Sequence, residues 1–216
     1  MSDTGVREVA VERQVLDPGA AHAAVEGMAT GTYATICAAT RTRRRWTLFS
    51  MDGPEFRLLS QRGDDWQLTS GPGRHLPGEL AGIPRHLETS AGTRPDDDPP
   101  RDPRPSRLAP GDALALADVV RRGDAKRIQA ACDDLQLAGL PWWVAELAWG
   151  ADALLSMMLT VHGRPQLATM LHLLPSGWGC LHADPDEELT FRSMSRLEVQ
   201  ARLSAFAALA MECAGV

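Results

Sequence analysis

The chain has 216 residues, of which 44% are hydrophobic and 23% charged, a composition typical of a globular protein that buries a core without disulfides or metals. No apolar run approaches the roughly 18 residues of a membrane-spanning helix, so we expect no membrane insertion. The 22 basic against 28 acidic residues give a net charge of −6, which argues against nucleic acid as a partner. Four scattered cysteines and no apolar signal segment indicate a reduced, cytoplasmic protein.

The first part of the chain predicts an antiparallel meander. Short segments of aromatic and aliphatic residues are separated by turn residues at 52–54 and 62–64. Strands are therefore expected at 33–40, 46–51, 55–60 and 65–69. After them, residues 72–86 predict a short helix broken by glycine and proline, or an irregular cap.

A proline-rich, charged stretch at 88–110 divides the chain nearly in half. So many prolines neither join a sheet ladder nor continue a helix, so the stretch predicts an exposed linker. Beyond it, Asp112 is placed to cap a first helix, and a second helix is expected over 128–135. Glycine and proline at 139–141 signal a stop and a restart, after which 142–158 predict a helix that runs into a strand.

The last third repeats the earlier pattern of strands followed by a helix. Strands are expected at 154–161, 167–174, 178–183 and 189–193. A terminal amphipathic helix follows, with the expected buried positions Leu197, Val199, Leu203, Phe206, Leu209 and Ala210.

The two strand-rich regions align without a gap at an offset of 123 residues, which places Leu48 on Leu171 and Leu80 on Leu203. Because regular meanders also match by chance, a true duplication and a coincidence both stay open. The pattern predicts an α+β fold with pseudo-twofold symmetry, in which two antiparallel β-meanders are each followed by a helix. In this single domain, 1–216, the half-repeats span 31–87 and 153–211, the linker 88–110, and the helical segment between them 111–152.

One polar cluster is a candidate for metal binding or nucleophilic catalysis. Pairing Leu174 with Trp178 across the predicted hairpin puts His172, Cys180 and His182 on one face. A thiol beside imidazoles can act as a nucleophile, or can hold zinc if a fourth ligand follows. Neither spacing is a recognised ligand signature, and a cysteine also packs as a small apolar residue. The sequence therefore assigns no catalytic residue, metal or cofactor. His172, Cys180 and His182 are the weak candidates for a metal site.

Two further clusters are candidates for partner binding. An arginine cluster precedes Trp46 and resembles an RNA-binding patch, but in an acidic protein it favours a solvated hairpin end or an acidic partner. Tryptophans at 142, 143 and 149 fall near one helical face, where they form core or a groove, with at least one near the surface. The candidate partner-binding residues are Trp142, Trp143, Arg43, Arg44 and Arg45.

The order of elements also carries a family resemblance. It rests on the segments 45–50, 56–59 and 66–68, on 138–141 after the helix pair, and on 177–180 and 189–191 before the last helix. Over about residues 32–211 the chain resembles the EspG-type proteins, which are cytoplasmic chaperones of the actinobacterial type VII (ESX) secretion systems. The resemblance implies a pseudo-twofold α+β fold and no enzyme activity. It also implies binding to the exposed tip of a helical PE–PPE substrate pair, which stays soluble until export.

The function that we expect is therefore that of a cytoplasmic secretion chaperone with a helical, secreted protein partner. One alternative is an enzyme or small-molecule binder with a pocket between the sheets that uses His172, Cys180 and His182. Another is an immunity-type inhibitor whose acidic stretches, 96–98 and 184–188, cover a basic toxin. An enzyme predicts a closed polar cavity, whereas a chaperone predicts an exposed apolar or mixed groove.

Overall fold

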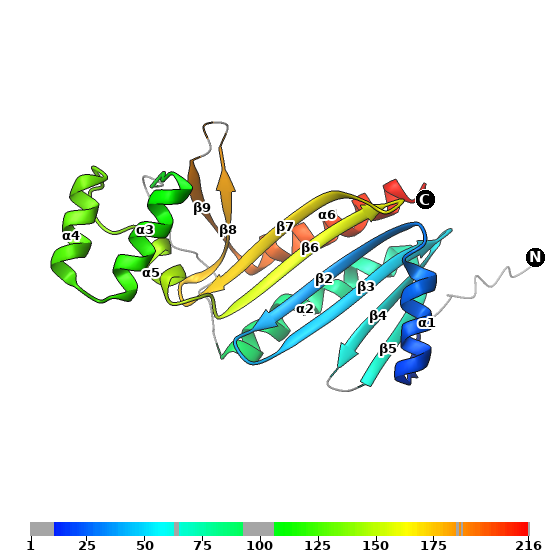
Figure 1. The fold of residues 1–216 in the computed structure, drawn as a ribbon. Helices are drawn as coiled ribbons and strands as arrows, with labels where there is room; N and C mark the ends of the chain where they lie inside the picture. Colours follow the sequence, from blue (N-terminus) through cyan, green and yellow to red (C-terminus); the bar gives the residue numbers. More distant parts are fainter. Residues whose placement is uncertain (1–10, 63–64, 93–105, 185, 187, 216) are drawn as a thin grey trace, which may run out of the picture.

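A single antiparallel sheet organises the protein in this computed structural model, which describes residues 11–62, 65–92, 106–184, 186 and 188–215. Within these ranges the sheet has nine strands in the order β1-β5-β4-β3-β2-β6-β7-β8-β9 (Figure 1). The strands are β1 Glu12–Leu16, β2 Thr32–Thr40, β3 Arg44–Asp52, β4 Glu55–Arg62, β5 Asp65–Pro72, β6 Ala153–Val161, β7 Arg164–Leu174, β8 Gly177–Ala183 and β9 Leu189–Met194.

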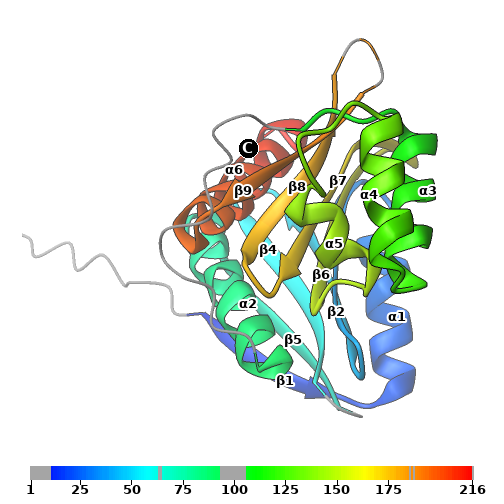
Figure 2. The ribbon, with the colours of Figure 1, turned by 90° about the vertical axis from the view of Figure 1, so that its left-hand side faces the viewer.

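Helices lie on both faces of the sheet. Figure 2 shows α2 and α6 on one side of the strands, and α1 with α3, α4 and α5 on the other. The helices are α1 Pro18–Met28, α2 Leu76–Ala91, α3 Pro110–Arg121, α4 Ala125–Asp134, α5 Trp142–Ala148 and α6 Arg196–Cys213, with a short 3-10 helix, η1 Gly73–His75, before α2.

The two halves of the chain meet at the centre of the sheet. Strand β2 pairs with β6 in antiparallel register, with Ile36 opposite Met157. Strands β2 to β5 form one four-stranded meander and β6 to β9 another, each leads into a helix, and the two helices, α2 and α6, pack against each other. The predicted α+β fold, with two meanders each followed by a helix and a helical segment between them, is confirmed. The sequence duplication and the half-repeat boundaries stay predictions.

The main core lies between the sheet and the helix pair α2/α6. Strand alternation points Ile36 and Phe49 to this side, where they meet Leu203 and Phe206 of α6. Most of the predicted buried positions of α6 are buried, but the prediction for Leu197 is wrong, because its side chain is 75% exposed. Leu197 precedes Val199 by two residues, which places it about 200° away around the helix, on the solvent side.

Helix α2 is longer than the sequence predicts. It runs without a break through Pro84 and ends at Gly92, whose φ of +74° is the left-handed conformation typical of a helix end. The predicted short, broken helix over 72–86 is therefore wrong, and α2 continues to Ala91, within the stretch predicted as linker. Burial of the apolar face of α2 against the sheet outweighs the cost of an internal proline. Residues 93–105 of the predicted linker lie outside the described residues.

The helices α3, α4 and α5 form a separate cluster at one end of the sheet, over Leu174 and Phe191. The predicted cap by Asp112 is wrong: Ala109 occupies the cap position of α3, with no side-chain hydrogen bond there. In α4 the backbone amides of Lys126 and Arg127 donate to the Asp124 side chain. The predicted helix running into a strand over 142–158 is divided into α5 and β6.

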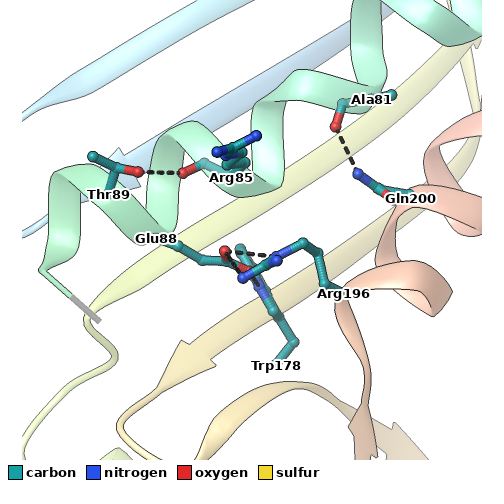
Figure 3. A network of polar contacts seen from close by, with 7 residues as sticks. All are labelled: Ala81, Arg85, Glu88, Thr89, Trp178, Arg196 and Gln200. Carbon is teal, nitrogen blue, oxygen red and sulfur yellow. Dashed lines mark hydrogen bonds and ion pairs between the residues drawn. The ribbon is translucent and has the colours of Figure 1, made fainter. Parts of the chain in front are cut away.

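A buried glutamate joins the two halves of the chain (Figure 3). The Trp178 indole Nε1 on β8 donates to Glu88 Oε1 at 2.8 Å. Arg196, at the start of α6, donates from Nε to both Glu88 oxygens at 2.9 and 2.7 Å, and its Nη2 lies 2.6 Å from Oε2. The Glu88 side chain is only 5% exposed, so these bonds offset the cost of burying its charge.

The hairpin of β7 and β8 differs in register from the prediction. Leu174 pairs with Gly177, not with Trp178, and His172 pairs with Gly179. The turn therefore contains two residues, 175 and 176. Because side chains alternate between the faces of a sheet, this shift by one residue places His172 on the opposite face from Cys180.

Glycine is required at position 179 because Phe191 of β9 crosses over it. A Cβ atom at Gly179 would lie 2.1 Å from Phe191 Cε1 and 2.6 Å from the Arg192 carbonyl oxygen. The Phe191 ring is held in turn by Trp142, edge-on at 5.2 Å, and by Trp143, stacked at 6.4 Å between ring centroids. These contacts attach the β8–β9 hairpin to α5.

We expect Glu88→Gln to lower the free energy of unfolding by about 2 kcal/mol, because it replaces charge-assisted hydrogen bonds with neutral ones in a buried site. Urea denaturation followed by circular dichroism measures the change. The exposed Glu212→Gln in α6 serves as the control and should leave the unfolding midpoint unchanged. Equal stability of the two variants would contradict the role given to Glu88.

We expect Gly179→Ala to lower the free energy of unfolding by about 2 kcal/mol, because the added methyl group overlaps the Phe191 ring. The matched control is Gly82→Ala, since an added Cβ there has open space within α2. The control should raise stability by about 0.5 kcal/mol, because alanine favours helices over glycine. The same denaturation measurement tests both, and a stabilising Gly179→Ala would refute the close packing.

Candidate protein-binding face

The helices leave the middle of one sheet face uncovered. On this face α1 packs over β3, β4 and β5, and the α3–α5 cluster packs over the end that carries Leu174 and Phe191. Between them lie the central strands β3, β2, β6 and β7, whose opposite face is buried under α2 and α6. Figure 1 views the sheet from this uncovered side, with α1 in front and α2 and α6 behind.

Side chains from the four central strands meet in register on this uncovered side. Trp46 pairs with Cys37, Cys37 with Ser156, and Ser156 with Met170, so these four form a row across the strands. The Trp46 side chain is 49% exposed and Met170 47% exposed. We call this surface the open face and define it by Thr35, Cys37, Ala39, Trp46, Leu154, Ser156, Met158, Ala168 and Met170.

The nine residues of the open face include no charged side chain, Arg44 lies at their border on the same side of the sheet, and the one thiol among them adds no charge. Burial raises the pKa of the Cys37 thiol, against the smaller lowering effect of the neighbouring Arg44 guanidinium. The thiol is therefore protonated at neutral pH. Large, partly exposed apolar side chains without charges are what a protein-binding surface offers, because their desolvation is favourable.

Basic residues border the open face at the end of the β2–β3 hairpin. Arg41 donates from Nη2 to the Gly150 carbonyl at 3.3 Å and lies 3.5 Å from Asp152 Oδ1. This contact brings the hairpin end to the loop after α5, where Trp149 is 64% exposed. The sequence placed Trp149 in an aromatic group but did not connect it with the hairpin, because the connection spans more than one hundred residues.

Strand alternation divides the predicted arginine cluster between two faces. Arg44 pairs with Ala39 on the side of the open face, whereas Arg45 pairs with Ala38 on the side of α2. A cleft of about 770 Å³ beside α2 is lined by Arg45, Glu79 and His86, and atoms of Arg43 and Arg44 also border it. Contact of these arginines with a partner stays a prediction.

The predicted tryptophan group is mostly core. Trp143 is 3% exposed and Trp142 is half-buried, both against Phe191, whereas Trp149 lies at the surface. The expectation that at least one of the three lies near the surface is confirmed. Contact of Trp142 or Trp143 with a partner stays a prediction, and the buried position of Trp143 gives that contact little surface.

His172, Cys180 and His182 do not share one sheet face as predicted, although all three line the cleft between β7 and β8. His172 lies on the side of the open face, whereas Cys180 and His182 alternate to the side of α6. Burial lowers the pKa of His172, so its imidazole is neutral at neutral pH. Among the described residues no group of three or more His, Cys, Asp or Glu side chains is placed to hold a metal ion.

The first residue of the acidic run 184–188, on which the inhibitor alternative rests, stabilises the turn that the run forms. The Asp184 carboxylate accepts hydrogen bonds from the backbone amides of Asp186 and Glu188, and lies 3.2 Å from Arg107 Nη1. Residues 96–98, the other acidic stretch, lie outside the described residues. Within the described part of the chain, no helix combines the length and apolar character needed to cross a membrane.

Sequence reasoning missed the residues that make up the open face. Trp46, Leu154, Met158 and Met170 each lie in a correctly predicted strand. The alternation in each strand separates its two sets of side chains, but it does not say which set the helices will cover. Pairing of β2 with β6, which joins the four strands, is not encoded by any local pattern.

We expect His172 to make the protein less stable as the pH falls below about 6.5, its ordinary pKa. As the pH falls below 6.5, the unfolded state takes up a proton on this imidazole, whereas the folded state takes it up only at lower pH. The free energy of unfolding therefore decreases between these two pKa values, and the full contribution of His172 to stability is present above them. Urea denaturation at pH 7.5 and 5.5 measures the loss. It should be smaller in His172→Gln and unchanged in the exposed His182→Gln, and an equal loss in all three proteins would contradict this assignment.

Comparison with known proteins shows a likeness of fold to a solved structure. No family model matches the chain, and no curated protein matches its sequence. The chain is similar in structure to the Mycobacterium tuberculosis type VII secretion system chaperone EspG5, solved in complex with the PE25–PPE41 dimer, with a TM-score of 0.55. The match covers 87% of this chain and 83% of that one at 11% sequence identity, a level that shows likeness of fold alone. This chain therefore has the mixed α+β fold seen in EspG5.

Proposed function

We propose that this protein is a type VII secretion chaperone that binds a helical PE–PPE substrate pair on its open face and keeps it soluble in the cytoplasm until export. The observation that carries the proposal is the uncharged, partly exposed surface around Trp46 and Met170, left bare between α1 and the α3–α5 cluster. The likeness of fold to EspG5, whose solved complex contains a PE25–PPE41 dimer, supports this class of partner.

The dimensions of the open face suit a helix. Neighbouring strands lie about 4.8 Å apart, so the three spacings from β3 to β7 give a width of about 14 Å. A helix with its side chains is about 10 Å across. One helix of a partner, or the tip of a helical pair, therefore fits on the sheet between the two helical walls.

The chemistry of the open face favours transient covering of an apolar surface. Tryptophan and methionine are typical anchors of protein interfaces, and Trp46 and Met170 face solvent from opposite ends of one row. Arg44 and Arg41 at the hairpin end supply a charged rim, which sets orientation more than affinity. A catalytic alternative that relies on His172, Cys180 and His182 is less favoured, because His172 projects from the opposite sheet face to the other two, although all three line one cleft.

We expect Trp46→Asp and Ser156→Arg each to weaken binding of a PE–PPE pair at least thirtyfold, since each introduces a charge into the desolvated centre of the interface. The test co-expresses this chain with the PE–PPE pairs encoded in its own genome. Size-exclusion chromatography with light scattering detects a 1:1:1 complex, and calorimetry measures its dissociation constant.

The matched control is Leu197→Asp, which puts the same charge on a side chain that is 75% exposed on α6, on the other side of the sheet. The control should bind like the wild type. If no PE–PPE pair forms a complex, the substrate assignment fails. If a complex forms and both open-face variants bind normally, the open face is not the binding site.

A further inference from the structure

Strands β7 and β8 in the second half of the chain separate, whereas the corresponding strands β3 and β4 in the first half stay paired. Strands β3 and β4 pair over six residues each, from Asp52 opposite Glu55 to Thr47 opposite Ser60. The corresponding strands β7 and β8 pair over only three, ending at His172 opposite Gly179. Beyond that point β7 continues to Arg164 and β8 to Ala183, and Figure 1 shows the two strands diverging.

Packing at both sides holds the strands apart. Strand β7 is paired with β6 along its length, whereas the β8–β9 hairpin is attached to α5 through Phe191. The turn between β7 and β8 is fixed as well, because Ser176 donates from its backbone amide and its hydroxyl to Glu146 of α5. The opening is therefore built by the fold, and it encloses a cleft of about 640 Å³.

The cleft presents two strand edges without a partner strand. Over 164–171 in β7 and 180–183 in β8, the edges that face each other take part in no strand pairing among the described residues. Each residue of a strand carries a backbone donor and an acceptor, and an unpaired edge is a template for another extended chain. Only the far end of β7 carries the usual protection, a charged residue and a proline at 164 and 165.

The cleft is lined by apolar side chains, by two arginines, and by polar side chains that include His172, Cys180 and His182. In the lining, Met170 is 47% exposed and Leu181 is 36% exposed. Leu167, which precedes the lining residue Ala168 in β7, is 38% exposed. Arg192 and Arg202 also line the cleft, and the described lining residues include no carboxylate. Glu198 lies 3.8 Å from Arg192 and also interacts with Arg202, but these contacts are exposed and contribute little to holding the arginines. A cationic cleft in a chain with net charge −6 favours an acidic ligand.

We propose that this cleft binds an extended, acidic segment of a partner protein, which adds as a strand between β7 and β8. The backbone edges supply the hydrogen bonds, the apolar side chains accept alternate residues of the segment, and Arg192 and Arg202 pair with its carboxylates. The site differs from the helix-binding site on the open face, with which it shares Ala168 and Met170. It gives the protein a second point of attachment to a partner, next to the first.

The test uses a pool of capped seven-residue peptides with Asp or Glu at odd positions and Val, Ile, Leu, Phe, Tyr or Thr at even ones. The pool is passed over the immobilised full chain, and a retained peptide is measured by calorimetry. We expect a retained peptide whose affinity falls at least tenfold when alternate backbone amides are methylated, because strand addition needs those donors. A pool in which Lys replaces Asp and Glu should not be retained.

Two variants and one mapping experiment locate the bound peptide. Arg192→Ala with Arg202→Ala should weaken binding at least tenfold, whereas the matched pair Arg85→Ala with Arg127→Ala, away from the cleft, should not change it. Amide hydrogen exchange should slow in 166–171 and 180–183 when the peptide binds. The proposal is overturned if the acidic pool is not retained, if methylated peptides bind equally well, or if exchange slows elsewhere.

Discussion

Antiparallel pairing of β2 with β6 is the constraint on which the rest of the structure depends. These strands are separated by more than one hundred residues, yet they pair over their whole length, from Thr32 opposite Val161 to Thr40 opposite Ala153. Their pairing turns two four-stranded meanders into one sheet and brings α2 and α6 together on the same face. The buried Glu88 then joins α2 to Trp178 and Arg196 of the other half, so the halves are linked by backbone pairing and by a charged network.

The joined sheet is wider than the helices on one side can cover. Helices α2 and α6 bury one face completely at its centre, whereas α1 and the α3–α5 cluster lie toward opposite ends of the other. The open face is therefore a consequence of where the chain places its remaining helices, not of a special sequence. Its apolar character follows from strands that supply Trp46, Met158 and Met170 to a surface without charges.

The α3–α5 cluster also makes the two halves unequal. Through Phe191 and Glu146 it holds the β8–β9 hairpin away from β7, while the corresponding strands of the first half stay paired. A segment inserted between two similar halves thus produces a wall beside the open face and a cleft between two strand edges. Both surfaces depend on the same helices, and they differ in chemistry: one is broad and uncharged, the other narrow and basic.

The sequence by itself determined strands β2 to β9, helices α2 to α6 and their order, because alternation, helical spacing and turn residues are local signals. It did not reveal that α2 continues to Ala91, because Pro84 and the glycines disfavour a helix unless tertiary packing outweighs them. It also misplaced His172, since a turn of two residues or three decides the face on which a side chain lies. Only the tertiary structure decided which strand faces stay bare and where β7 and β8 separate, because both depend on contacts between residues far apart in the chain.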